Sequence, residues 1–170
     1  MKLTLVDTDT ATSAALKVAF APFSEVSVFN TDLLLLAENT IVSPANSQGF
    51  MDGGIDAAYS AAIPDVEDRV REAIARREEG HLPLGAAVIV SVTHPRIQYV
   101  IATTTMLMPE AVDSTHAYRS MRAMLRVAGA HPDRVRSVYC PGLCTGIGRV
   151  SPEEAAEAMA KAYGDWKRAQ

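Results

Sequence analysis

The stretch Cys140-Pro-Gly-Leu-Cys-Thr-Gly-Ile-Gly148 says most about the fold of this chain and about its ligand. It follows an apolar run, residues 138–140, that is typical of a buried strand, and it precedes Ser151-Pro-Glu-Glu154, which predicts the start of a helix. A loop rich in Gly and Thr between a strand and a helix N-terminus suits an anion. Glycine lets backbone N–H groups approach an oxygen closely, and the helix dipole adds positive potential. The loop therefore predicts a ligand that carries phosphate.

Strands and helices alternate through most of the remaining chain, and one pair of strands, joined through His94-Pro95, is expected to form a hairpin. This order predicts an α/β fold: a three-layer α/β/α sandwich around a central mixed sheet, in a single domain over residues 1–170. Ligand-binding loops are expected at the carboxyl ends of the strands. The expected strands are residues 2–6, 26–29, 40–43, 86–92, 97–102 and 135–140, and the expected helices are residues 10–20, 57–62, 64–80, 114–128 and 151–167.

Composition narrows the classes of function. Of the 170 residues, 48% are apolar and 21% charged, and the formal net charge is −4. No basic block occurs, which argues against duplex nucleic acid as the main partner. The longest aliphatic run, residues 33–37, is too short to cross a bilayer, and residues 1–7 lack the apolar region of a signal peptide. We therefore expect a cytoplasmic protein without membrane contact.

The two cysteines, Cys140 and Cys144, are expected to be reduced thiols, as is usual in the cytoplasm. The four histidines are scattered and show no spacing typical of a metal site, so we expect no metal ion and no cofactor. A minor alternative is that Cys144 is a nucleophile, because its position close to a helix start could lower the pKa of its thiol.

A second group of residues follows two earlier strands. Asp32 comes directly after one expected strand, Asn46 lies beyond the end of the next, and the pair Gly53-Gly54 opens a short helix. These loops are expected to converge at one edge of the sheet, beside residues 145–148.

The order of these residues resembles the macro domain, a family of ADP-ribose-binding modules, over roughly residues 2–161. Asp32 and Asn46 are fourteen residues apart, as are the Asp of a Gly-Asp-Ile/Leu turn and the last Asn of an Asn-Ala-Ala-Asn motif in the family. Gly53-Gly-Ile-Asp56 is similar to the glycine run that follows that motif in the family. Cys144-Thr-Gly-Ile147 is similar to the family's late phosphate loop.

The resemblance implies a role for each residue. Asp32 would accept a hydrogen bond from the adenine amino group, a role that suits a carboxylate because it only accepts. Asn46 would contact the distal ribose. The backbone N–H groups of the late loop would hold the diphosphate. The ligand-binding residues implied in this way are Asp32, Leu33, Asn46, Gly53, Gly54, Ile55, Thr145, Gly146, Ile147 and Gly148.

Some members of the family hydrolyse ADP-ribosyl conjugates, ADP-ribose 1″-phosphate or O-acetyl-ADP-ribose. In the hydrolytic branch the Asn and the Asp assist a water molecule, and Asn46 and Asp56 occupy those positions here. The implied partners are ADP-ribose or a related nucleotide, and an ADP-ribosylated protein or nucleic-acid end that carries it.

The sequence departs from the family pattern at several positions. Ser43 and Pro44 replace the first Asn and an Ala of the Asn-rich motif, and Gly148 replaces an aromatic residue that often covers the distal ribose. The usual C-terminal aromatic residue that stacks on adenine has no clear counterpart. These departures keep two alternatives to a hydrolase open: a non-catalytic ADP-ribose reader, and a structural or assembly module without ligand affinity.

The candidate residues also have purely structural interpretations. Asp32 would cap the turn after a strand, Asn46 would form an Asx turn, and Asp56 would be an acid in the first turn of a helix. Two other nucleotide-binding classes are disfavoured. The Gly-x-Gly-x-x-Gly fingerprint of dinucleotide oxidoreductases is absent after the first strand, where Asp7-Thr-Asp-Thr10 stands, and no strand is followed by a P-loop Gly-Lys-Ser/Thr.

Overall fold

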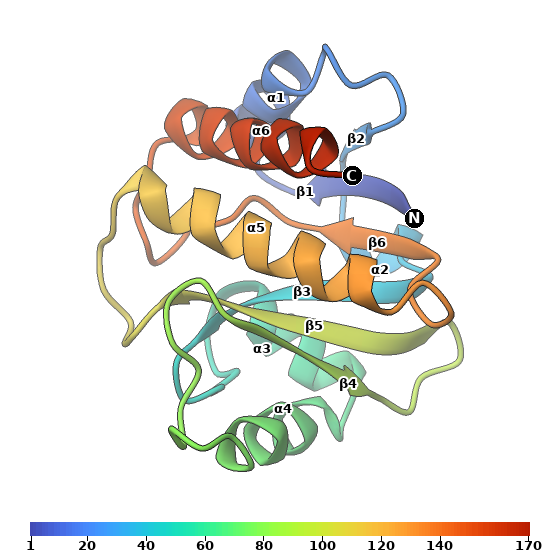
Figure 1. Cartoon of the computed structure of the whole chain (residues 1–170), viewed down its shortest axis with the longest axis vertical. Helices are drawn as coiled ribbons and strands as arrows, with labels where there is room; N and C mark the ends of the chain where they lie inside the picture. The colour runs from blue at the N-terminus through green and yellow to red at the C-terminus, as the bar shows by residue number, and fades with distance from the viewer.

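The computed structural model describes residues 1–170 and contains one six-stranded sheet with the order β2-β1-β6-β3-β5-β4 (Figure 1). All neighbouring strands are parallel except β4 and β5, which form the expected antiparallel hairpin, so the predicted mixed sheet is confirmed. The strands are β1 (Lys2–Asp7), β2 (Ser27–Asn30), β3 (Asn39–Asn46), β4 (Ala87–Ser91), β5 (Ile97–Met106) and β6 (Ser137–Cys140).

Helices cover both faces of this sheet, which gives the three-layer α/β/α sandwich that was predicted (Figure 1). Leu16, Met121 and Met159, from α1, α5 and α6, belong to the larger apolar core on one face. Leu33 and Tyr59, from α2 and α3, belong with residues of α4 to the core on the other face. The helices are α1 (Thr10–Ala19), α2 (Leu33–Leu36), α3 (Gly54–Ala62), α4 (Val66–Ala75), α5 (Ser114–Ala130) and α6 (Pro152–Arg168). None of them is both long enough and apolar enough to cross a bilayer.

Capping side chains fix where the helices on the first face begin. The predicted N-cap of α6 is present: Ser151 Oγ accepts the N–H of Glu154 at 3.3 Å and donates to the Glu154 carboxylate at 2.7 Å. Asp9 caps α1 by accepting the N–H of Thr12 at 2.7 Å. The cap of α5 is Asp113 and not the expected Ser114, because Asp113 accepts the N–H of Thr115 at 2.8 Å.

Several expected boundaries were wrong. Strand β5 continues to Met106, four residues past its expected end, and the short helix α2 was not predicted. Strand β3 does not stop at Pro44 but continues to Asn46, because its pairing with β5 runs through Pro44 to Asn46. On its other side, β3 pairs with β6 only at Thr40 and Ile41. Beyond Ile41 that side of β3 has no partner strand, so the missing N–H of Pro44 costs no ladder bond. Helix α3 begins at Gly54, three residues earlier than expected, and α4 ends at Ala75, several residues before Gly80.

The parallel strands determine where a ligand can bind. Strands β1, β2, β3, β5 and β6 all run in the same direction, so their carboxyl ends meet along one edge of the sheet. The segments that follow these strands are far apart in sequence but adjacent in space, as expected for a crevice outside the carboxyl ends of an α/β sheet.

Candidate functional site

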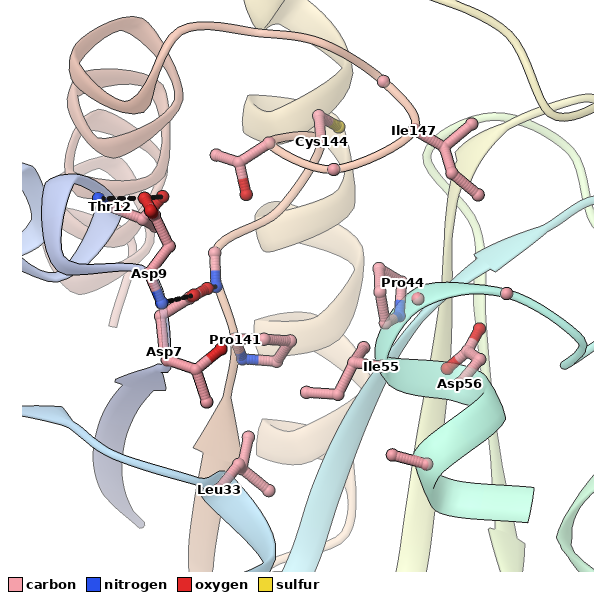
Figure 2. Close-up of a pocket in the computed structure, with 18 of the residues that line it drawn as sticks. Asp7, Asp9, Thr12, Leu33, Pro44, Ile55, Asp56, Pro141, Cys144 and Ile147 are labelled. Carbon is pink, nitrogen blue, oxygen red and sulfur yellow. Dashed lines mark hydrogen bonds between the residues drawn. The ribbon is translucent and has the colours of Figure 1, made fainter. Parts of the chain in front are cut away.

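A cavity of about 690 Å³ lies along this edge of the sheet, and segments after five strands line it. All eleven residues that the sequence singled out for binding or catalysis are among its lining residues, so the expected convergence of the loops is confirmed. Figure 2 shows Asp7 and Asp9 on one side of the cavity and Asp56 on the other, with the loop of Cys144 and Ile147 between and above them. The volume falls in the range typical of small-molecule sites.

The loop after β6 presents a row of backbone donors. The N–H groups of residues 144–148 make no hydrogen bond within the protein, whereas those of Arg149 and Val150 bond to the carbonyls of Gly146 and Cys144 at 3.0 Å. Gly148 is held in turn, because its carbonyl accepts the N–H of Val112 at 2.9 Å. A row of free N–H groups in a loop that turns back on itself is typical of an anion-binding nest.

Helix α6 adds to the positive potential of this loop. Its first residue, Pro152, lines the cavity directly after the loop. The N-terminus of a 17-residue helix carries about half a positive charge, which favours an anion there. The loop and the helix together therefore form the strongest candidate for a phosphate site in the cavity.

At the β1 and β2 end of the cavity, Asp32 is exposed and caps α2, with its Oδ1 accepting the N–H of Leu34 at 2.9 Å. The interpretation of Asp32 as a cap is thus correct. The cap does not compete with ligand binding, because a carboxylate has acceptor capacity for further hydrogen bonds.

Asn46 also has a structural role. Its Oδ1 accepts the N–H groups of Gln48 and Phe50 at 3.0 and 3.3 Å, and its Nδ2 donates to the carbonyl of Phe50 at 2.9 Å. The interpretation of Asn46 as an Asx-turn residue is therefore correct. The side chain nevertheless lines the cavity while it holds the loop of residues 46–50 in place.

Asp56 is the most perturbed carboxyl group of the cavity. It lies in the first turn of α3, is only 6% exposed, and its Oδ1 has no hydrogen-bond partner. Burial raises the pKa of Asp56 to about 7, and the carboxylate of Glu67 adds to the rise. The buried hydroxyl of Ser43 opposes this rise in pKa, although no hydrogen bond of normal geometry joins the two groups. A carboxyl group that titrates near neutral pH is suited to proton transfer.

The lining of the cavity is acidic. It includes no Lys, Arg or His and five aspartates, namely Asp7, Asp9, Asp32, Asp52 and Asp56. A phosphate bound here would therefore depend on backbone N–H groups and the helix N-terminus instead of cationic side chains.

Three of these aspartates, Asp7, Asp9 and Asp52, were not predicted as site residues. Asp7 joins two loops: its Oδ1 accepts the N–H of Asp9 at 2.9 Å and its Oδ2 accepts the N–H of Gly142 at 3.0 Å (Figure 2). Gly142 has no room for a side chain, because a Cβ there would lie 2.5 Å from Thr12 Cγ2. The sequence signal was the Asp7-Thr-Asp-Thr10 run after the first strand, but nothing in the sequence places it next to residue 142.

The alternative in which Cys144 is a nucleophile is wrong. Cys144 is buried, and burial raises the pKa of its thiol to about 12 instead of lowering it. Both cysteines are free thiols. No group of three or more His, Cys, Asp or Glu side chains is arranged to hold a metal ion.

Comparison with known sequences gives a family match. The model of the macro domain family matches residues 42–159. An uncharacterized protein of Aquifex aeolicus is 32% identical over 136 residues, which cover 79% of this chain and 78% of the relative. The O-acetyl-ADP-ribose deacetylase of Escherichia fergusonii is 26% identical over 144 residues, which cover 84% of this chain and 80% of that enzyme.

Comparison with solved structures agrees on the fold. The macrodomain of Mycobacterium tuberculosis DarG aligns with a TM-score of 0.68 at 19% identity, over 80% of this chain and 88% of that one. The Oceanobacillus iheyensis macrodomain, solved with ADP, aligns with a TM-score of 0.64 at 20% identity, over 78% of this chain and 71% of that one.

Proposed function

This chain belongs to the macro domain family, whose members bind ADP-ribose, and from that premise we propose that its cavity binds ADP-ribose or a close derivative. The observation that carries the proposal is the row of free N–H groups at residues 144–148, next to the N-terminus of α6. This row suits a diphosphate, which offers several oxygens in a line. The resemblance in sequence and the ADP in the Oceanobacillus iheyensis macrodomain support the same class of ligand.

The rest of the nucleotide extends from this loop in two directions. Adenine binds at the β1 and β2 end, where Asp32 accepts a hydrogen bond from its amino group and Leu33 lies against it. The distal ribose binds at the β3 end, between the loop held by Asn46 and the first turn of α3. Gly53, Gly54 and Ile55 line that end.

The base site gives the first testable prediction. Asp32→Ala removes the acceptor of the adenine amino group, so we expect affinity for ADP-ribose to fall about 10-fold, the effect of losing one hydrogen bond to a charged group. Affinity for the hypoxanthine analogue of ADP-ribose, which lacks the amino group, is expected to change much less. Isothermal titration calorimetry measures both constants.

Asp133→Ala is the control for this prediction, because Asp133 is exposed and does not line the cavity. An equal loss of affinity for the adenine and hypoxanthine compounds in Asp32→Ala would show that Asp32 acts only as the cap of α2.

Within this binding function, we favour hydrolysis of an ADP-ribosyl ester or conjugate over simple recognition. Burial raises the pKa of Asp56 to about 7, so its carboxyl group can accept or donate a proton near neutral pH. Asn46 holds the loop that borders the distal ribose. The named activity of the Escherichia fergusonii relative supports this chemistry.

Turnover distinguishes an enzyme from a reader. With O-acetyl-ADP-ribose and ADP-ribose 1″-phosphate as substrates, we expect measurable release of acetate or phosphate by the wild type. In Asp56→Asn, which keeps the shape but removes the proton-transfer group, we expect a fall of at least about 100-fold. Asp52→Asn, in the same loop region, is the matched control.

Each remaining outcome identifies an alternative. Binding of ADP-ribose without turnover of either substrate would make the protein a reader, and no binding by folded protein would make it a structural or assembly module. The ADP-ribosylated protein or nucleic-acid end that would carry the nucleotide, the single domain and the cytoplasmic location stay predictions.

A further inference from the structure

Exposed apolar side chains gather at the β3 and β5 end of the cavity. Four of the eight large hydrophobic residues that the chain exposes lie here: Phe50, Leu107, Met108 and Ile147, which are 44%, 44%, 69% and 47% exposed. Phe50 and Ile147 line the cavity, and Leu107 and Met108 lie between two residues that also line it, Met106 and Pro109. We call these four side chains the apolar rim.

Phe50 is held in place although it is exposed. The side chain of Asn46 bonds to both the N–H and the carbonyl of Phe50. The preceding residue, Gly49, has a φ of +74° and packs so closely against α4 that a Cβ there would lie 2.8 Å from Ile74 Cδ1. The guanidinium of Arg71, also in α4, lies 4.4 Å from the centre of the Phe50 ring. Because the backbone of Phe50 is held by Asn46 and its ring is contacted by Arg71, this exposed ring is preorganised for contact with a ligand.

Ile147 closes the rim from the other side. Its Cδ1 lies 3.4 Å from the position of a Cβ on Gly53, so the side chain reaches from the phosphate loop toward the first turn of α3 (Figure 2). With Phe50 on the loop after β3 and Met108 on the loop after β5, the rim borders the opening where the distal ribose ends. In the proposed binding mode, any group joined to C1″ of that ribose would leave the cavity at this point.

The side chains at this end favour a ring among such groups. Asp52 and Asp56 line the cavity here, and no cationic side chain does. Arg71 is exposed and lies against the Phe50 ring. A ring joined to C1″ would therefore meet apolar carbon and the open part of the Phe50 ring, which are surfaces that suit it.

We infer that the apolar rim receives a planar ring joined to C1″ of the distal ribose, so that the preferred ligands are ADP-ribosyl compounds with a ring aglycone. This inference rests on the proposed function, because the rim has this meaning only when ADP-ribose lies in the cavity. It adds a substrate class to that function, with Phe50 as the residue that determines specificity.

Three nucleotides test the inference: ADP-ribose, NAD⁺, which carries a cationic ring at C1″, and NADH, which carries a neutral ring. Titration calorimetry of the full chain gives the three dissociation constants. We expect NAD⁺ and NADH to bind at least as tightly as ADP-ribose. In Phe50→Ala, we expect the ratio of each ring compound's affinity to that of ADP-ribose to fall about 3- to 10-fold, which is the effect of losing one aromatic contact.

Phe29→Ala is the matched control, because Phe29 is 46% exposed and does not line the cavity. Its affinity ratios are expected to equal those of the wild type. If ADP-ribose binds while NAD⁺ and NADH bind at least 10-fold more weakly, the inference is overturned and the proposed function stands. It is overturned equally if Phe50→Ala changes all three affinities by the same factor. If folded protein binds none of the three, both the inference and the proposed function fail.

Discussion

Asp56→Asn is expected to raise the free energy of unfolding by up to about 4 kcal/mol at pH 8, and to change it by less than about 1 kcal/mol at pH 4. The reason is that burial raises the pKa of Asp56 to about 7 from an ordinary value of 3.8. A displacement of about three pKa units corresponds to about 4 kcal/mol, at 1.36 kcal/mol per unit. The buried amide of the variant pays no such cost, because it never ionises.

The direction of the pH dependence follows from proton binding. Between pH 4 and pH 7 the folded protein keeps the Asp56 proton while the unfolded chain has lost it. The folded state then binds more protons, so the free energy of unfolding of the wild type falls as the pH rises through this window. Above pH 7 both states are ionised at this group, and the difference between wild type and variant stays constant.

Urea unfolding of both proteins at pH 4.5 and pH 8 measures this effect. Asp52→Asn is the control, because Asp52 is exposed. A stability difference between wild type and Asp56→Asn that is the same at both pH values would mean that Asp56 does not titrate near pH 7. It would also remove the physical basis for its role as a proton-transfer group.

Gly148→Ala is expected to weaken ADP-ribose binding by at least about 100-fold. A Cβ on Gly148 would lie 2.6 Å from the carbonyl oxygen and 3.1 Å from the Cα of Cys144. Both are backbone atoms, so the loop must move, and the row of N–H groups at residues 144–148 loses its alignment. Losing two hydrogen bonds to a charged phosphate accounts for a change of about this size.

Gly146→Ala is the matched control in the same loop, because a Cβ there has no neighbour within 4 Å and the backbone does not need to move. We expect it to keep binding within about 10-fold of the wild type. Calorimetry gives both affinities, and circular dichroism checks that the core of Gly148→Ala remains folded. Wild-type affinity in a folded Gly148→Ala would show that this loop does not hold the diphosphate.

The sequence predicted the elements whose signals are local. The capping box at Ser151 and the apolar run of β4 placed α6 and the hairpin correctly, because capping and hairpin pairing depend on residues close in sequence. The end of β3 was missed because the effect of Pro44 depends on which neighbour pairs with that side of the strand. Pairing of distant strands cannot be deduced from local pattern.

In the candidate site too, the features that depend on local sequence could be predicted, and those that depend on contacts between distant segments could not. Asp32, Asn46 and residues 145–148 could be identified because the resemblance fixes their order and spacing. The bridge from Asp7 to Gly142 joins residues 135 positions apart and depends on β1 lying beside β6. The raised pKa of Asp56 depends on burial, which its place in the first turn of α3 determines and its sequence neighbours do not.

Titration calorimetry of the wild-type protein with ADP-ribose, at pH 7 and with AMP as comparator, tests the account most directly. We predict saturable binding with one site per chain and an affinity for ADP-ribose at least about 10-fold above that for AMP, which lacks the second phosphate and the distal ribose. Absence of heat at two temperatures, together with an unchanged Tm in the presence of ADP-ribose, would contradict it. A folded protein with that result would have the macro domain fold without ADP-ribose as its ligand.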